Sequence, residues 1–334
     1  MRELYREIAA RLQDGQGSEL TTQYSPQGIR RRLAEIPMGG EPKEGLTFTK
    51  TTEGCTLVER FLPKPRLLIL GGGHIALPLV ELADMLGFET WVYDDRPSFV
   101  SPARFPRAHR VICGDFSNIG AALGFRRGDY VTILTRGHRH DMICLQTLFQ
   151  GGEVPHYVGM IGSKRRIAIV KEQAAAQLAD ATVLDRLYAP IGLPIGSVTP
   201  EEIALSILAE IVKIKRLGPD GRRNKALQEG GLDEALLHWL SDRKNEALAL
   251  VTIVSTRGST PREQGAKMAV KATGEIQGSI GGGCTEAEVL KKARDVIDQG
   301  GYLLMEVDLT DAAEEEGMVC GGVMEVLIEA IGTK

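Results

Sequence analysis

The sequence predicts an α/β protein with a Rossmann-type parallel-sheet domain and a smaller α+β domain. Three observations support this fold class. Strand-like and helix-like segments alternate between residues 64 and 216. Within this region, Gly71-x-Gly73-x-x-Ala76 separates a strand from a helix, as in the dinucleotide-binding βαβ unit. From residue 232 onward, short strands are separated by glycine-rich loops, which is typical of a separate α+β domain.

Composition and charge limit the classes of function. The chain has 334 residues, enough for about two domains, with 40 basic and 44 acidic residues. This near balance does not support a broad nucleic-acid surface. No run is long and apolar enough to span a membrane, and the N-terminus lacks a signal-peptide core, so we expect a cytoplasmic protein. The five cysteines form no CxxC pair, which argues against a disulfide framework or a zinc ribbon.

The first 63 residues are predicted to contain one helix and one strand. Apolar residues recur at helical spacing over residues 4–12, and residues 56–61 have the composition of a strand. The sequence between them is polar and interrupted by Gly and Pro. Pro63-Lys64-Pro65 marks a boundary, so we place the Rossmann domain at residues 64–216.

The first strand, turn and helix of the Rossmann domain form the predicted phosphate-binding turn. Residues 67–70 are a continuous apolar run, typical of a parallel strand buried on both faces. Gly71 and Gly73 allow a tight turn and let a pyrophosphate approach the positive end of the following helix. Asp94, at the end of the second strand, could accept hydrogen bonds from ribose hydroxyls. A tight turn that binds nothing would have the same pattern.

Further polar residues lie in turns that follow predicted strands, where ligands of parallel sheets bind. His74 could face a ligand or form a hydrogen bond with the loop backbone. Ser163 and Lys164 open a helix and could hold an anion, or they could simply begin a capped, charged helix. The remaining strands of this domain are predicted at residues 111–113, 130–135 and 157–161.

A third polar turn contains His138, His140 and Asp141, which lie close together in the sequence. Histidine and carboxylate side chains are common metal ligands, but the sequence offers no obvious further ligand for this group. We therefore predict no metal site here and interpret these residues as solvated or phosphate-facing.

The end of the Rossmann domain is predicted from helix-start signals. A Pro- and Gly-rich loop at residues 189–196 precedes a helix over residues 200–216. Thr199 is a suitable N-cap, and Glu202 completes a capping box. Residues 217–231 are rich in Gly and charge and are predicted to be a linker.

The domain predicted at residues 232–334 contains more glycine turns than packing alone would require. Strands are predicted at residues 248–254, 267–270, 275–280, 302–307 and 323–329, with a helix after residue 283. The glycine-rich segments resemble ligand-binding loops. They are RGSTPREQGAKM at residues 257–268, GSIGGGCTEAE at residues 278–288 and VCGG at residues 319–322.

These three segments resemble the small domain of the XdhC/CoxI family, accessory proteins for molybdenum hydroxylases such as xanthine dehydrogenase. The matching Rossmann segments are residues 71–76, 94–97, 138–141, 162–166 and 189–210. The resemblance implies a chaperone that binds the pterin-type molybdenum cofactor transiently. It also implies that the chaperone assists sulfuration of this cofactor by a cysteine desulfurase and its delivery to a xanthine dehydrogenase-like hydroxylase.

The residues of the small domain permit this chemistry. Phosphate could be held by Ser259, Thr260, Arg262, Lys267 and glycine N–H groups. Cys284, at a predicted helix start, could be a stabilised thiolate, and Cys320 could supply a second sulfur or molybdenum contact. Each could instead be a small buried residue in a tight turn. The predicted cofactor-binding set also includes Gly282, Gly283 and Glu286.

The order of domains departs from the family pattern, in which the small domain usually comes first. Here residues 1–62 could be a decayed copy of the small domain, since LYREIAARLQDGQGSEL resembles ALLHWLSDRKNEALAL. This copy would lack the GSTPR and GGGC segments. The arrangement could reflect a fusion, or a homodimer in which the small domain of one protomer serves the cleft of the other.

Two other functions fit parts of the sequence. The glycine turn and Asp94 would suit an NAD(P)-dependent oxidoreductase, although no convincing proton-relay pair is visible beyond His74 or the pair His138 and His140. A purely structural or docking protein would bind no small molecule. The nucleotide of the Rossmann domain also stays open: it could be part of a dinucleotide form of the molybdenum cofactor, NAD(P) or a free nucleotide.

Overall fold

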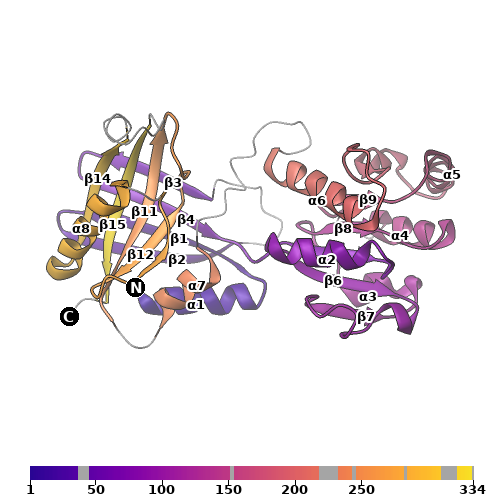
Figure 1. Cartoon of the computed structure of the whole chain (residues 1–334), viewed down its shortest axis with the longest axis horizontal. Coiled ribbons are helices and arrows are strands. Elements are labelled where there is room, and N and C mark those ends of the chain that lie inside the picture. Colours follow the sequence, from indigo (N-terminus) through magenta and orange to yellow (C-terminus); the bar gives the residue numbers. More distant parts are fainter. Residues whose placement is uncertain are drawn as a thin grey trace. The chain divides into compact units, whose positions relative to one another are not determined.

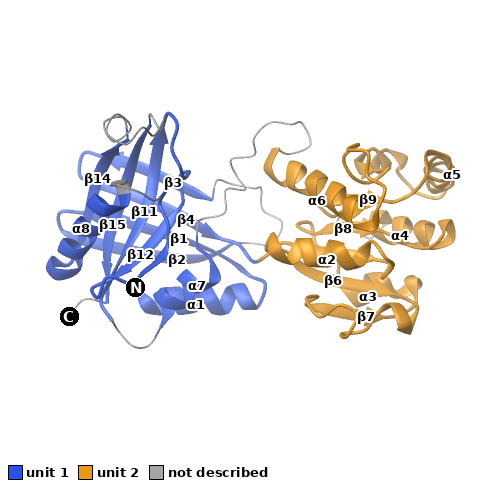
Figure 2. Ribbon diagram, viewed as in Figure 1, with its two compact units in different colours: residues 1–63, 225–334 blue, residues 64–224 orange. Residues whose placement is uncertain are grey.

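The computed structural model describes residues 1–36, 45–150, 154–217, 232–242, 246–281, 284–309 and 322–332, apart from the side chains of residues 284 and 285. It divides into two compact units (Figure 2). Unit 1 combines residues 1–63 with residues 225–334, and unit 2 spans residues 64–224. The N-terminal segment and the small domain therefore belong to the same unit, although the Rossmann domain separates them in the sequence.

Unit 2 has the parallel sheet that the sequence predicts. Its six strands have the order β10-β9-β8-β5-β6-β7 and β5 pairs with β8 in parallel. Strands β5, β6 and β7 are added towards one edge of the sheet, and β8, β9 and β10 towards the other, so the strand order reverses between β5 and β8. This reversal is the point at which Rossmann sheets bind nucleotides. The strands are β5 (Arg66–Leu70), β6 (Glu89–Asp94), β7 (Arg110–Cys113), β8 (Tyr130–Ile133), β9 (Tyr157–Met160) and the two-residue β10 (Leu187–Tyr188).

Helices cover both faces of this sheet (Figure 1). Alternate residues of β5 point to opposite faces: Leu67 and Ile69 pack with α2 and α6, whereas Leu68 and Leu70 pack with α3, α4 and α5. The capping box predicted for α6 is present, because the Thr199 N–H donates to Glu202 Oε2 at 3.0 Å. The helices are α2 (Ala76–Met85), α3 (Ile119–Leu123), α4 (His138–Gln150), α5 (Lys164–Ala175) and α6 (Pro200–Leu217), with 3₁₀ turns η1 (Pro97–Phe99), η2 (Phe116–Asn118) and η3 (Ala181–Arg186).

The C-terminal part of unit 1 is a five-stranded antiparallel sheet with the order β13-β12-β11-β15-β14. Helix α8 (Cys284–Gln299) packs on one face through residues such as Val289 and Ala293, which share a core with Val251 and Ile253 of β11. The strands are β11 (Leu248–Arg257), β12 (Lys267–Lys271), β13 (Ile276–Gly278), β14 (Tyr302–Asp308) and β15 (Val323–Ile331).

The N-terminal part of unit 1 contains more structure than its sequence predicts. Besides α1 (Arg2–Gln13) it forms a four-stranded antiparallel sheet, where one strand was expected. The missed strands carry Thr, Arg and Glu, and every residue of β2 is half-buried or exposed, so its apolar alternation is weak. The strands are β1 (Gly17–Ser25), β2 (Gly28–Ile36), β3 (Leu46–Thr51) and β4 (Gly54–Phe61), in the order β2-β1-β4-β3.

The two sheets of unit 1 share a core. Leu248 and Leu250, on the face of β11 opposite α8, pack with Leu20 and Phe61 of the N-terminal sheet. Helix α7 (Glu234–Ser241) packs beside α1 in the same core. The sequence of the N-terminal segment does not reveal its strands clearly because their apolar partners lie at the other end of the chain. Descent of this segment from a copy of the small domain stays a prediction.

Among the described helices, none is both long enough and apolar enough to cross a lipid bilayer.

Candidate functional site

The described parts of three glycine-rich segments of unit 1, which the sequence singles out separately, meet at one end of the five-stranded sheet; of the third segment this is Gly322. Antiparallel pairing of Arg257 with Val323 places the exit of β11 beside the entry to β15. Gly322 lies against the first loop, and a Cβ there would come within 2.4 Å of the Ser259 carbonyl oxygen. A Cβ on Gly281 would come within 2.5 Å of Pro261 Cγ. Glycine is required at both positions because the segments approach so closely.

Glu286 fixes the second of these loops. Its Oε1 accepts hydrogen bonds from Ser279 Oγ at 2.9 Å and from the Ile280 N–H at 3.3 Å. The Gly281 N–H in turn donates to Ser279 Oγ at 3.1 Å. Glu286 lies in the first turn of α8, so it ties the loop to the helix start. The direct cofactor contact predicted for Glu286 stays a prediction.

The cysteines predicted to handle sulfur cannot be placed in this site. Cys320, Gly282 and Gly283 lie outside the described residues, as does the side chain of Cys284. The backbone of Cys284 begins α8. Their predicted roles therefore stay predictions.

The first loop presents two of its predicted phosphate ligands to solvent. Ser259 and Arg262 are exposed, and Thr260 Oγ1 donates to the Arg262 carbonyl oxygen at 2.9 Å, which stabilises the bend between them. An exposed hydroxyl and guanidinium beside glycine backbone can bind an anion. These residues fit the predicted chemistry.

Lys267 does not fit it. Its side chain is fully buried, and its ammonium group bonds the Glu59 carboxylate of β4 and Thr252 Oγ1 of β11. An ammonium group held in this way cannot reach a ligand at the exposed loop. Lys267 instead joins the two sheets of unit 1. The predicted phosphate contact was wrong because the sequence did not reveal that the Glu59 carboxylate lies beside the Lys267 ammonium group.

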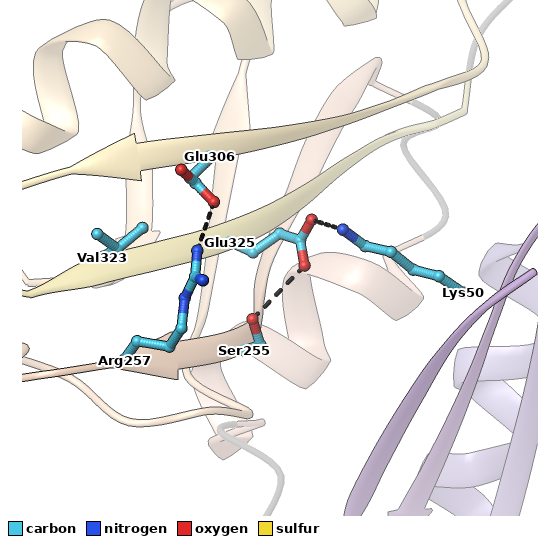
Figure 3. A pocket seen from close by; sticks show the side chains of 6 residues that line it. All are labelled: Lys50, Ser255, Arg257, Glu306, Val323 and Glu325. Atoms are coloured by element: carbon cyan, nitrogen blue, oxygen red, sulfur yellow. Dashed lines mark hydrogen bonds and ion pairs between the residues drawn. The ribbon is translucent and has the colours of Figure 1, made fainter.

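A polar pocket of about 290 Å³ adjoins the glycine loops (Figure 3). Arg257 Nη2 lies 2.8 Å from Glu306 Oε2, and Lys50 forms an ion pair with Glu325. Arg257 directly precedes the first loop and Val323 directly follows Gly322. The lining residues are Lys50, Ser255, Arg257, Glu306, Val323 and Glu325.

Apart from Arg257, which begins the first glycine-rich segment, the sequence did not single out these pocket residues as a site. Lys50 comes from β3, one of the strands that its sequence did not reveal, and no motif surrounds it. Glu306 and Glu325 lie on paired strands β14 and β15, directly opposite each other. Two neighbouring acidic residues on paired strands would be a recognisable signal only once the register of the strands is known.

In unit 2, the predicted phosphate-binding turn is built as expected for a Rossmann domain. Gly71 has a φ of +121°, and a Cβ there would come within 2.4 Å of the Leu134 carbonyl oxygen. A Cβ on Gly73 would meet no atom within 4 Å, so the outer side of the turn is open. His74 is exposed beside it. The turn therefore offers backbone access to a ligand at the start of α2.

Asp94 is at the predicted position, but its carboxylate is held inside the protein. The side chain is 2% exposed and accepts hydrogen bonds from the Gly72 N–H at 2.8 Å and from Arg96. Burial raises the pKa of this carboxyl group, but the hydrogen bonds from Arg96 and from backbone N–H groups outweigh burial and lower the pKa from 3.8 to about 2. Its predicted contact with ribose hydroxyls stays a prediction.

Replacing Asp94 with Asn is expected to destabilise unit 2 by about 2 kcal/mol at neutral pH, since each unit of pKa shift corresponds to about 1.4 kcal/mol. The folded-state pKa lies below the unfolded value, so this stabilisation is present above about pH 4 and is lost as the pH falls towards 2. Urea unfolding followed by Trp91 fluorescence, in a Trp239→Phe background, would measure it. An Asp94→Asn protein as stable as its parent at pH 7 would contradict this role.

The two other polar turns of unit 2 contain internal contacts, and the anion contact predicted for Ser163 and Lys164 stays a prediction. Ser163 caps α5 by accepting a hydrogen bond from the Arg166 N–H at 3.3 Å, and Lys164 beside it is exposed. Asp141 is fully buried and bonds Arg166 Nη2 at 2.5 Å. The interpretation of Asp141 as a solvated residue was therefore wrong, because Arg166 of the neighbouring helix neutralises it. Across the described residues, no group of three or more His, Cys, Asp or Glu side chains could hold a metal ion.

Known protein families match parts of both units of this chain. A family model described as the XdhC Rossmann domain matches residues 67–211, and one described as the XdhC and CoxI family matches residues 241–308. The chain belongs to the XdhC/CoxI family. Residues 1–66, including Lys50 and Glu59, lie outside both matched regions of this family.

Similar proteins of known sequence include relatives in two bacteria. A Bacillus subtilis (strain 168) protein, described as a probable subunit of xanthine dehydrogenase, is 32% identical over 169 residues, which cover 51% of this chain and 48% of that protein. The uncharacterized protein YqeB of Escherichia coli (strain K12) is 30% identical over 180 residues, which cover 54% of this chain and 32% of that protein. The chain thus matches about half or less of the length of these relatives.

A solved structure supports the same relationship. The crystal structure of a xanthine dehydrogenase from Bacillus halodurans resembles this XdhC/CoxI family member with a TM-score of 0.52 and 27% identity. The similarity covers 63% of each chain.

Proposed function

We propose that this XdhC/CoxI family member is an accessory protein that binds the pterin-type molybdenum cofactor and passes it to a xanthine dehydrogenase-like hydroxylase. The observation that carries this proposal is the close approach of Gly281 and Gly322, from two glycine-rich segments, to the first glycine-rich loop beside a polar pocket in unit 1. The relative from Bacillus subtilis, described as a probable part of xanthine dehydrogenase, supports the choice of client.

The chemistry of the cofactor fits the described residues. Its phosphate would bind the exposed Ser259 and Arg262 together with loop N–H groups. Its pterin ring carries neighbouring N–H donors, which a carboxylate accepts in pairs, and Glu306 at the pocket is 58% exposed. The pocket, at about 290 Å³, is at the small end of ligand sites, so we assign it to the ring system and not to the whole cofactor.

Sulfuration belongs to this proposal as a further step. Helix α8 begins at Cys284, and the positive end of a helix stabilises a thiolate. We propose that Cys284, with Cys320, contacts the sulfur or molybdenum end of the cofactor. A cysteine desulfurase would then be a second partner, and a homodimer would be the assembly that presents the cofactor.

Replacing Arg262 with Ala is expected to weaken delivery of the cofactor about tenfold, because a hydrogen bond from this exposed side chain to a charged group contributes about 1.5 kcal/mol, the low end of the usual range. The loop bend should survive, since Thr260 bonds the backbone carbonyl of Arg262 and not its side chain. The measurement is the activation of a cofactor-free xanthine dehydrogenase-like hydroxylase by the cofactor-loaded protein, as a function of its concentration.

Arg30→Ala is the matched control for this experiment, because Arg30 is also an exposed arginine of unit 1 but lies on β2. It should deliver cofactor as the parent protein does. Equal activation by the Arg262→Ala, Arg30→Ala and parent proteins would remove Arg262 from the site. No activation by any of them, the parent included, would sink the proposed function.

A further inference from the structure

The acidic residue of the Rossmann fingerprint has no capacity left for a ribose. In Rossmann domains that bind an unmodified ribose, an acidic residue near the end of the second strand accepts hydrogen bonds from the sugar. Here the Asp94 carboxylate accepts four hydrogen bonds. Two come from the backbone N–H groups of Gly72, at 2.8 Å, and Arg96, at 3.0 Å. Two more come from Arg96 Nε and Nη2, both at 2.8 Å. An ionised carboxylate has about four acceptor positions, so these bonds fill it.

The group presented to solvent in its place is a guanidinium. The Arg96 side chain is 30% exposed, and its guanidinium lies 3.6 Å from the centroid of the Phe99 ring. Its two side-chain bonds to Asp94 use two of the five N–H donors that a guanidinium carries. Stacking on Phe99 fixes the plane of the group, which favours paired hydrogen bonds to a phosphate.

A second arginine lies at the same turn. Arg104 donates to the Gly72 carbonyl oxygen, with Nη2 at 3.3 Å, and its guanidinium lies 5.3 Å from the Phe99 ring centroid. Gly72 must be glycine because a Cβ there would come within 2.3 Å of the Phe99 carbonyl oxygen. The segment that follows β6 is therefore packed onto the glycine turn, and it brings both arginines with it.

The charge balance at this edge favours an additional anion. Asp95 is neutralised by Arg136, whose Nη2 lies 2.8 Å from Asp95 Oδ2. Arg96 pairs with Asp94 and its Nε lies 4.0 Å from Asp95 Oδ1, while Arg104 contacts the Gly72 carbonyl oxygen. Three arginines, Arg136 included, therefore meet two carboxylates at this turn, which leaves a net positive charge. An unmodified ribose has no group that would use this charge, whereas a ribose phosphate has one.

We propose that unit 2 binds a nucleotide whose ribose carries a phosphate, with Arg96 and Arg104 as the residues that determine this specificity. The glycine turn at Gly71 and Gly73 would hold the 5′-phosphates, and the two arginines would hold the phosphate on the sugar. This inference goes beyond the proposed function because it concerns the other unit of the chain and a second ligand.

The test is equilibrium binding of two ligand pairs to the full chain by isothermal titration calorimetry: NADP⁺ against NAD⁺, and adenosine 2′,5′-bisphosphate against AMP. The parent protein is expected to bind the phosphorylated member of each pair at least tenfold more tightly. Equal binding within both pairs, tighter binding of NAD⁺ and AMP, or no binding of any of the four ligands would overturn the proposal.

Two variants separate the roles of the arginines. Arg96→Ala should remove the preference and strengthen NAD⁺ binding, because it frees the Asp94 carboxylate for the ribose. Arg104→Ala leaves the contacts of Asp94 in place and should weaken only the phosphorylated ligands. Arg107→Ala is the control, since this exposed arginine pairs with Glu81 and Asp84 on α2 and should change nothing. An unchanged preference in folded Arg96→Ala and Arg104→Ala proteins would also overturn the proposal.

Discussion

Replacing Lys267 with Met is expected to destabilise unit 1 by about 3–5 kcal/mol, the largest effect on stability that we predict. The Lys267 ammonium group is fully buried and bonds Glu59 of the N-terminal sheet and Thr252 of β11. The variant would leave the Glu59 carboxylate, whose side chain is 5% exposed, buried without its cation. Loss of one partner of a buried ion pair costs far more than loss of both.

The double variant Lys267→Met/Glu59→Leu is the matched control, because it removes both charges and fills the space with apolar atoms. It should recover most of the lost stability. The protein has two tryptophans, and Trp239 lies in unit 1, so urea unfolding followed by fluorescence in a Trp91→Phe background would report on this unit alone. A single variant as stable as its parent, or a double variant no more stable than the single one, would contradict the claim that the ion pair of Lys267 and Glu59 stabilises unit 1.

Replacing Gly322 with Val is expected to weaken binding of the molybdenum cofactor by roughly 10- to 100-fold, the largest effect on function. A Cβ at this position would lie 2.4 Å from the Ser259 carbonyl oxygen and 2.8 Å from Thr260 Cγ2. Backbone atoms cannot rotate away as a flexible side chain can, so the first loop must move. Overpacking of this kind costs about 1–3 kcal/mol. This cost opposes binding because the loop must regain its present position to hold the cofactor, and about 1.4–2.8 kcal/mol of it corresponds to the expected loss of affinity.

Gly128→Val is the control for this substitution. A Cβ on Gly128 would meet no atom within 4 Å, and its backbone does not lie in the left-handed region that favours glycine. This variant makes the same chemical change in unit 2 without any clash. It should bind the cofactor as the parent protein does.

The Rossmann domain could be predicted from the sequence because its signals are local. The apolar run of β5, the glycine turn and the capping box of α6 each lie within about one element, and their interpretation needs no knowledge of distant residues. The parallel direction of the strands followed from the alternation of strands and helices. The structure confirms this domain as an α/β fold with a parallel sheet.

The N-terminal sheet and the role of Lys267 could not be predicted because they depend on long-range contacts. Glu59 and Lys267 are 208 residues apart in the chain, and only the packing of the two sheets brings them together. The same reason explains why Lys50 was not recognised as a pocket residue. A lysine in a glycine-rich motif was assigned to a ligand, although its side chain points into the core.

The site residues too could be predicted only where their signal is local. Glycine at residues 281 and 322 indicates that another segment comes close to the backbone there. The sequence does not reveal which segment this is. Antiparallel register at Arg257 and Val323 supplies that information. The position of the acidic residue Asp94 was predictable, whereas Arg96, only two residues later, determines what the carboxylate can bind.

The most direct test of the central proposal is an equilibrium titration of the purified protein with the molybdenum cofactor, carried out anaerobically on the parent protein and on the Gly322→Val and Gly128→Val variants. We predict saturable binding of one cofactor per chain by the parent protein and the Gly128→Val variant, and binding weakened roughly 10- to 100-fold in Gly322→Val. Equal affinity of all three proteins, or no saturable binding by the parent protein, would contradict a cofactor site at the three glycine loops.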